Sequence, residues 1–210
     1  MTADLRANFD KVSLQLERFG LLLLSDASLP SVSTLVADER IRGSWWAHKA
    51  AHKIFAVSEM LADHQDVMIM KLVSEKTTFV HRELWRRVYS IGVAREDWQV
   101  KDLSAEANRL FKALDAEGSL RTNTLGKKFG PKPGNIARDL ELRLLIHADQ
   151  IHTESGAHAK MLETWDSWAE RAGFRAKAQS PTAARLFLEQ RLAEINQKYD
   201  AKGRLPWQKQ

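Results

Sequence analysis

Apolar residues recur at helical spacing near both ends of the chain, with polar residues on the opposite face. This pattern predicts an N-terminal helix over residues 3–19 and a final helix from Ser180–Pro181 to about Tyr199, where proline suits the first helical position. The positions on the apolar faces are Phe9, Val12, Leu16 and Phe19 in the first helix, and Ala184, Leu188, Leu192 and Ile195 in the last.

Between these helices, strand-like runs separated by polar turns predict two hairpins, and the Thr, Phe and Val residues over 77–82 suit a pleated surface. Residues 67–73 and 77–82 flank a polar turn and form a first hairpin, and residues 145–153 and 157–162 flank a Ser155-Gly156 turn and form a second. Residues 21–25 predict an additional strand.

Short helical segments precede each hairpin. In the second half, Ser104 is a typical cap for a helix over 105–116, and Asn135 for a helix that ends near residue 145. A short helix over 122–128 lies between them. The corresponding segments of the first half are residues 30–37, 44–48 and 54–64, and residues 95–103 form the connector.

The two halves share a signature at an offset of 80 residues, in which Glu83, Trp85 and Arg95 correspond to Glu163, Trp165 and Arg175. Gly92 and Gly173 fall one position out of this register, and both are expected to end a helix in the left-handed conformation. We interpret the two tryptophans as anchors of each hairpin on its helices. The sequence therefore predicts an α+β, mainly helical fold of two tandem winged-helix-like modules, over residues 1–98 and 99–210, with flanking N- and C-terminal helices.

Composition narrows the class of protein. The 210 residues carry a formal net charge of +5, which permits a polyanionic partner. Cysteine is absent, which fits a reducing compartment, and residues 1–20 lack the pattern of a signal peptide. The longest apolar run, Leu21–Leu24, is too short to span a bilayer. We therefore expect a cytoplasmic protein without a membrane partner, and the sequence does not indicate an oligomeric state.

Two segments are candidates for binding nucleic acid. In the first half, aromatic and basic residues are interleaved before the third helix, where tryptophan could stack on a base and the cations could hold phosphates. In the second half, lysines precede the third helix and arginines project from it. The candidate residues are Arg42, Trp45, Trp46, Lys49 and Lys53 in the first segment, and Lys127, Lys128, Lys132, Arg138 and Arg143 in the second. The alternatives are tryptophans packed in the core, of which at most one can be central, and solvated lysines.

The second hairpin carries a histidine- and glutamate-rich cluster, namely His147, His152, Glu154 and His158. A two-residue turn would pair Thr153 with His158 and place His158 on the face opposite His152 and Glu154. Because this spacing matches no metal motif, we expect neither a metal nor a cofactor. The sequence also lacks a nucleophile elbow, a phosphate-binding glycine-rich loop and an HExxH motif.

The stretch from Leu29 to Trp98, with Arg42-Gly43-Ser44-Trp45-Trp46 and Thr78-Phe79-Val80-His81-Arg82, resembles a bacterial family distantly similar to the AlkZ/YcaQ-type tandem winged-helix DNA glycosylases. Residues 121–158 resemble the same family. Those glycosylases carry a Gln-apolar-Gln type catalytic motif on a hairpin. Here Gln150-Ile151-His152 matches that motif only in its first two positions, because histidine stands in place of the second glutamine. The catalytic candidates that the resemblance implies are Gln150, His152 and Glu154.

Three functions fit these observations. The first is a protein that binds nucleic acid, double-stranded DNA above all, in repair or regulation. The second is a base-excision DNA glycosylase-like enzyme, which would hold an extruded base near Trp45 or Trp46 and the hairpin. The third is a winged-helix scaffold for protein interaction, which is favoured because a net charge of +5 is small for a dedicated DNA-binding protein of this size. The sequence leaves open whether the protein is an enzyme.

Overall fold

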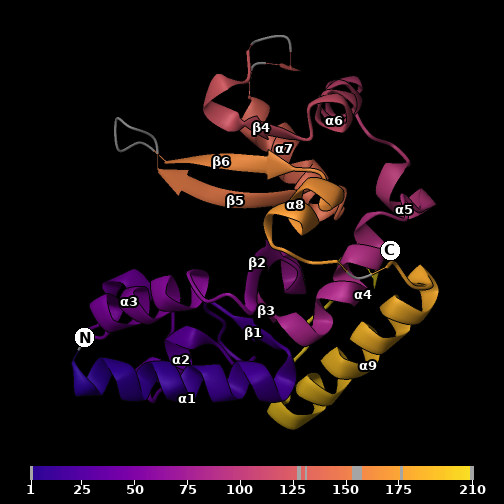
Figure 1. Cartoon of the computed structure of the whole chain (residues 1–210). Helices are drawn as coiled ribbons and strands as arrows, with labels where there is room; N and C mark the ends of the chain where they lie inside the picture. Colours follow the sequence, from indigo (N-terminus) through magenta and orange to yellow (C-terminus); the bar gives the residue numbers. More distant parts are fainter. Residues whose placement is uncertain (1, 127–128, 131, 153–157, 176, 209–210) are drawn as a thin grey trace. The chain divides into compact units, whose positions relative to one another are not determined.

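The computed structural model describes residues 2–126, 129–130, 132–152, 158–175 and 177–208. The fold is α+β and mainly helical, with two small three-stranded antiparallel sheets (Figure 1). The chain divides into two compact units. Unit 1 comprises Met1–Trp85 and Arg185–Gln210, and unit 2 comprises Arg86–Ala184.

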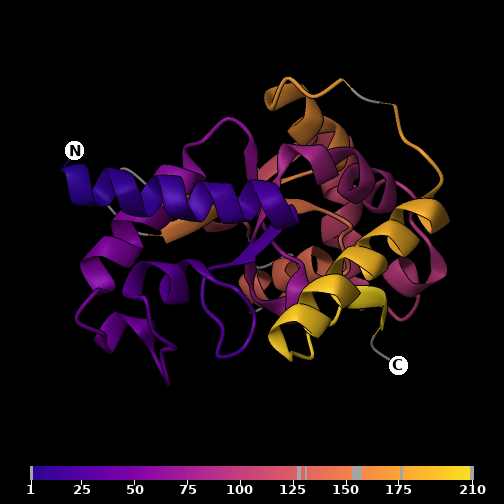
Figure 2. The ribbon, with the colours of Figure 1, turned by 90° about the horizontal axis from the view of Figure 1, so that it is seen from below.

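Unit 1 begins with helix α1 (Ala3–Phe19), which Thr2 caps by accepting a hydrogen bond from the Leu5 amide at 3.3 Å. Helix α1 packs on helices α2 and α3 and lies across the front of Figure 2. The C-terminal end of helix α9 meets the end of α1 through an edge contact between Tyr199 and Phe19. The elements are α1, β1 (Leu21–Leu23), α2 (Val32–Ala37), a 3₁₀ helix (Trp45–Ala47), α3 (Ala51–Ala62), β2 (Val67–Lys71), a 3₁₀ turn (Val73–Glu75), β3 (Thr77–His81), the start of α4 (Arg82–Gly92), most of α9 (Pro181–Tyr199) and a 3₁₀ turn (Pro206–Gln208).

Unit 2 contains the rest of α4 and a second set of elements in a similar order. Helix α6 begins where Ser104 accepts a hydrogen bond from the Ala107 amide at 3.0 Å. The elements are α5 (Asp97–Val100), α6 (Ala105–Glu117), β4 (Ser119–Arg121), a 3₁₀ helix (Thr122–Thr124), α7 (Pro133–Leu142), β5 (His147–His152), β6 (His158–Glu163) and α8 (Trp165–Arg171).

The two units share one topology. Each has a long helix, a short strand, two further helices, a hairpin and a closing helix, and the sheet orders are β1-β3-β2 and β4-β6-β5. Gly20 and Gly118 occupy equivalent places, because each ends the first helix with positive φ, 74° and 75°. Their carbonyls accept hydrogen bonds from the His81 and Thr164 amides, the last residues before α4 and α8. The repeat is therefore shown by the glycines and the strand pairing.

This structural register differs from the offset of 80. The donors to the glycine carbonyls, His81 and Thr164, are equivalent residues. Trp85 lies four residues after the first donor and Trp168 four residues after the second, so Trp168, and not Trp165, corresponds to Trp85. The first helix of unit 1 is α1, not residues 30–37. Gly92 was expected to end a helix in the left-handed conformation, but only Gly173 of that pair has positive φ. Gly92 instead makes room for the Trp165 indole, whose Nε1 would lie 2.1 Å from a Cβ at that position.

Each unit has its own apolar core between its helices and one face of its sheet. The expected apolar faces of the first and last helices are buried. The core of unit 1 contains Phe9, Val12, Leu16, Leu22, Val32, Val36, Ile41, Trp45, Ile54, Val57, Leu61 and Phe79. The core of unit 2 contains Ala107, Leu110, Phe111, Leu114, Phe129, Ala137, Leu140, Leu145, Ile146 and Leu162.

Several local predictions are wrong for identifiable reasons. Asn135 does not cap α7, because Pro133 occupies the first helical position and Lys132 precedes it. The segment 44–48 forms a three-residue 3₁₀ helix, not an α-helical segment. Strand β4 carries little pattern of its own and exists by pairing with β6. In the second hairpin His152 pairs with His158, which shifts the expected register by one residue.

Candidate nucleic-acid interface

The segment between α2 and α3 places one tryptophan inside the protein and its neighbour outside. Trp45 is 9% exposed and belongs to the core of unit 1, whereas Trp46 is 61% exposed. Their rings stack with centroids 4.0 Å apart and planes 25° apart. The 3₁₀ helix of residues 45–47 supplies the local backbone for this stack. The prediction that at most one of the two could be central to the core is confirmed.

Helix α3 adds a second exposed aromatic side chain. Phe55 is 44% exposed, and its ring lies 5.6 Å from the Trp46 ring at an interplanar angle of 39°. Full burial of an aromatic side chain is worth about 1.5–3 kcal/mol, so leaving two of them exposed side by side forgoes stability. Contiguous exposed apolar surface with a polar rim is typical of an interaction site.

Arg42 and Lys49 lie within four residues of Trp46 in the sequence. Lys49 pairs with Glu39 at 3.3 Å, whereas Lys53 pairs with Asp4 of α1 at 2.8 Å, on a different side of α3 from Phe55. The Lys49 side chain is 82% exposed, and hydrogen bonding to it lowers the pKa of Glu39 below its ordinary value. Exposed ion pairs contribute only about 0–1 kcal/mol, so a phosphate can replace either carboxylate at little cost. Trp46, Phe55, Arg42 and Lys49 are called the aromatic–basic patch below.

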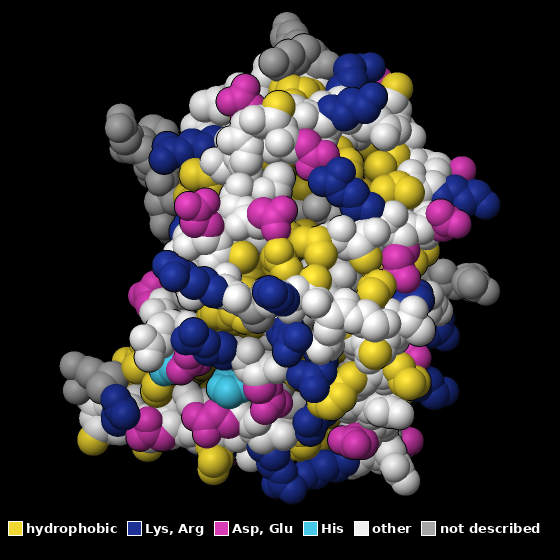
Figure 3. Space-filling model, turned by 45° about the vertical axis from the view of Figure 1, so that its right-hand side comes forward, with side chains coloured by type: hydrophobic (Ala, Val, Ile, Leu, Met, Phe, Trp, Pro, Cys, Tyr) yellow, Lys and Arg dark blue, Asp and Glu magenta, His cyan; other side chains and the backbone are white. Residues whose placement is uncertain are grey.

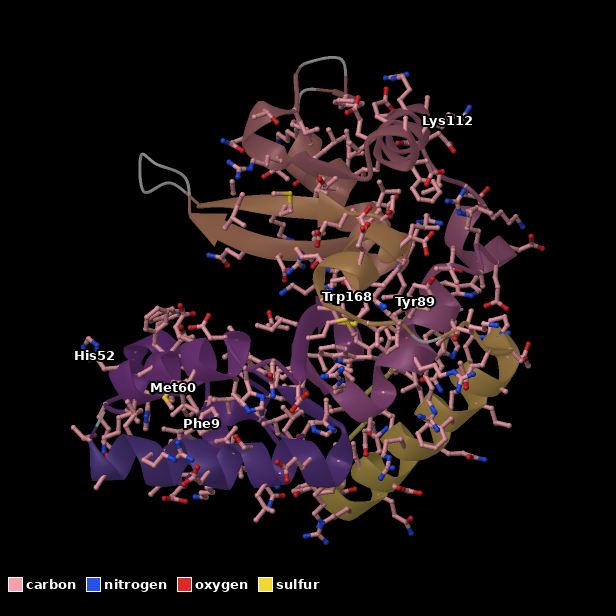
Figure 4. The ribbon with its side chains drawn as sticks, in the orientation of Figure 1. Phe9, His52, Met60, Tyr89, Lys112 and Trp168 are labelled. Carbon is pink, nitrogen blue, oxygen red and sulfur yellow. The ribbon has the colours of Figure 1, made fainter. Side chains whose placement is uncertain are left out.

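Arg42 is exposed, and no carboxylate of the described residues forms an ion pair with it. His48 Nε2 lies 3.2 Å from Glu39 Oε1, so Glu39 contacts both His48 and Lys49. His52 points outward from the first turn of α3 (Figure 4). The start of α3 thus presents cationic and aromatic groups together.

The candidates in unit 2 are placed differently. Lys132 and Arg138 are exposed at the start and on the outer face of α7. Arg143 is engaged within the unit, since it donates to Asp139 at 3.1 Å and to the Lys101 carbonyl at 2.7 Å. Lys127 and Lys128 lie outside the described residues.

The hairpin candidates are described only in part. Gln150 is exposed on β5, where it pairs with Lys160 of β6. His152 and His158 are cross-strand partners, but their side chains lie outside the described set, as does the whole of Glu154. A site built from Gln150, His152 and Glu154 therefore stays a prediction.

A cluster of charged groups lies between this hairpin and α8. His147 Nδ1 lies 3.8 Å from Asp149 and 3.7 Å from Glu163, and the three side chains offer ligand atoms within 4.8 Å of one another. Arg171 donates to both oxygens of Glu163, at 2.8 and 2.7 Å, and also contacts Asp149. Arg171 thus pairs with both carboxylates, and the cluster is an ion network that fixes α8 to the sheet.

Electrostatics support this structural role. Burial would raise the pKa of Glu163, but interactions with His147 and Arg171 outweigh burial and lower it to about 2. Hydrogen bonding to Glu163 raises the pKa of Arg171. Sequence reasoning had grouped His147 with His152, Glu154 and His158, and it missed Asp149, Glu163 and Arg171. Alternation along β5 could have paired His147 with Asp149, whereas the approach of α8 had no sequence signal.

A polar hollow of about 450 Å³ lies beside α8. Tyr89 donates a 2.6 Å hydrogen bond to Asp166 there, which raises the pKa of the phenol to about 12. Tyr89 and Trp168 lie near each other in Figure 4, and the ring of Phe174 contacts both. The hollow is lined by Tyr89, Asp166, Ala169, Glu170, Gly173, Phe174 and Arg175.

Basic and acidic side chains are interspersed on the face drawn in Figure 3, together with patches of apolar surface. For binding a polyanion, a local group of cations, such as Arg42 and Lys49 near Trp46 in the sequence, therefore matters more than the net charge of +5. The helices in the described part of the chain fall short of the length and apolar character needed to cross a bilayer.

A family model described as AlkZ related matches residues 7–204, nearly the whole chain. The chain therefore belongs to the AlkZ-related family, in agreement with the resemblance of its motifs. Comparisons with curated proteins and with solved structures found no match.

Proposed function

We propose that this protein binds DNA through the aromatic–basic patch of unit 1 and acts in DNA repair. The observation that carries the proposal is the Trp46 ring, 61% exposed and stacked on a buried tryptophan, in a segment that also holds the exposed cations Arg42 and Lys49. Membership of the AlkZ-related family supports a role in repair, because the family is named for a type of DNA glycosylase.

Topology supports the same proposal. A helix, a strand, two helices and a hairpin, with the last strand in the centre of the sheet, is the plan expected of a winged helix. On this plan each unit is a winged-helix module, and α3 takes the place of the helix that meets DNA. The patch lies at the N-terminal end of α3 and in the segment before it, where residues of a recognition helix first contact DNA.

The cations of the patch test this proposal. Binding of a fluorescein-labelled 20-base-pair duplex is measured by anisotropy between about 50 and 200 mM salt. Replacing Arg42 and Lys49 together with glutamine is expected to weaken binding and to reduce the slope of log K against log salt by about 2. Lys112→Gln, at an exposed lysine on α6 (Figure 4), is the matched control and should leave the slope unchanged. An unchanged slope in the double variant would contradict the placement of the interface.

Excision of a damaged base is a second candidate function. Family membership favours it, and Gln150 is exposed on the hairpin of unit 2. The test is release of free base from a duplex that carries a single alkylated purine. Gln150→Ala should abolish release if Gln150 is catalytic, while leaving binding of the same duplex unchanged. Base release that is equal in the variant and the wild type would remove Gln150 from the site.

A further inference from the structure

The geometry of Trp46 points to a more specific ligand. Given the proposed function, we infer that the aromatic–basic patch recognises a DNA base that has left the helical stack, such as an unpaired base in a bulge. Trp46 is the platform on which that base stacks, and Lys49 and Arg42 hold the adjoining phosphates.

The tryptophan pair forms a fixed platform. Trp45 is held in the core of unit 1 and covers one face of the Trp46 indole at a stacking distance of 4.0 Å. Phe55 lies tilted beside the same ring. Because Trp46 is nevertheless 61% exposed, much of its surface is open to a ligand. A ring already fixed by its neighbour loses little conformational freedom when a second flat ring stacks on it.

The Trp46 platform can stack only on a base that has left the helical stack. Bases inside an intact duplex have both faces covered by their neighbours, so an indole cannot stack on them without opening the helix. An unpaired base presents a free face, and every base has such a face, so the platform would be tolerant of sequence. A tryptophan platform therefore discriminates between disrupted and intact DNA, whereas cations alone would bind the backbone of either.

Charge on the patch favours a nucleic acid over a protein as the occupant. Lys49 is exposed, and its ion-pair partner among the described residues is the surface carboxylate of Glu39. Arg42 has no carboxylate partner among those residues. An exposed aromatic ring with exchangeable cations three and four residues away in the chain matches a base with its flanking phosphates.

The test compares two labelled ligands with the full-length protein. One is a 20-base-pair duplex, and the other is the same duplex with one unpaired adenine. The wild type should bind the bulged duplex more tightly. Trp46→Ala should weaken binding of the bulged duplex by about 5- to 150-fold, the range that loss of one base–aromatic stack produces, and should change binding of the intact duplex by less than about threefold. Trp46→Phe should restore most of the affinity for the bulge.

Leu14→Ala is the matched control, because Leu14 is 62% exposed on α1, away from the patch in sequence. It should leave both affinities unchanged, and circular dichroism should show that each variant is folded. Equal binding of both ligands by the wild type, or an equal loss for both in Trp46→Ala, would overturn the inference while leaving DNA binding intact. Failure to bind either ligand would overturn the proposed function itself. A wild-type dimer that Trp46→Ala converts to a monomer would assign the patch to a second copy of the chain.

Discussion

Replacing Arg171 with methionine should destabilise unit 2 by a predictable amount. Arg171 binds both oxygens of Glu163, whose side chain is only 5% exposed. The substitution therefore leaves a buried carboxylate without its arginine partner. Removal of one partner from a buried ion pair costs about 3–5 kcal/mol. The Arg171 side chain is 51% exposed, so water can reach the vacated space and reduce that penalty. We expect a loss of about 2–3 kcal/mol in the free energy of unfolding at pH 7.

The pKa of Glu163 gives the scale of the stabilisation that His147 and Arg171 together provide against the cost of burial. The folded protein lowers this pKa from 4.5 to about 2. Each pKa unit corresponds to about 1.4 kcal/mol, so the shift corresponds to roughly 3 kcal/mol. Because the folded pKa is depressed, this stabilisation is present above pH 4.5 and is lost as pH falls towards 2. Without Arg171, burial should raise the pKa of Glu163, so the variant should lose less stability over that interval than the wild type.

The assay is urea unfolding followed by circular dichroism, at pH 7 and at intervals down to pH 3. Glu163→Gln and the double variant with Arg171→Met complete a mutant cycle that isolates the pair. Arg109→Met removes an exposed pair with Glu106 at 3.2 Å on α6 and should cost less than about 1 kcal/mol. A loss below about 1 kcal/mol for Arg171→Met, with an acid dependence equal to that of the wild type, would refute the reasoning.

Two further predictions concern unit 2. Gly92→Ala places a Cβ 2.1 Å from Nε1 of Trp165 and should cost about 1–3 kcal/mol of unfolding free energy. Gly134→Ala should cost little, because a Cβ there meets no described atom within 4 Å beyond its chain neighbours and its own helix backbone. Thermal unfolding distinguishes the two variants. Tyr89 should ionise near pH 12, because its hydrogen bond to Asp166 favours the neutral phenol, so an ultraviolet titration should show one of the two tyrosines ionising late. Ionisation of both near pH 10 would contradict the hydrogen bond.

The helices at both ends of the chain were predictable because their apolar faces and caps are local features. The first runs over Ala3–Phe19 as expected, Ser104 caps α6, and the last helix begins at Pro181. The hairpin strands were also predicted, the first pair from β-branched residues and the second pair from the Ser155-Gly156 turn signal. Strand β4 was not, because three residues carry too little pattern and become a strand only through β6.

The offset of 80 residues aligns two tryptophans that are not structurally equivalent. Trp85 donates to the Val80 carbonyl, whereas Trp165 donates to the Leu144 carbonyl. The equivalent residues are glycines, Gly20 and Gly118, whose left-handed conformation ends a helix before a strand. A glycine directly after an amphipathic helix was a usable signal in both units.

The candidate site was predictable in part. The sequence indicated an interleaved aromatic and basic segment and required that one tryptophan lie outside the centre of the core. It could not show that Trp46 is the outer one, nor that Phe55 joins it, because both depend on how α3 packs. The charged network of Glu163 and Arg171 depends equally on long-range packing.

Hydrogen–deuterium exchange with and without DNA tests the central claim most directly. The ligand is the 20-base-pair duplex with one unpaired adenine, added in excess. With DNA bound, we expect slower amide exchange in residues 39–55 than in the free protein. These residues include the 3₁₀ helix of the tryptophan pair and the first turn of α3. Peptides from α9 should exchange at the same rate with and without DNA. Unchanged exchange in residues 39–55 under conditions where DNA is bound would contradict the claim that this patch is the interface.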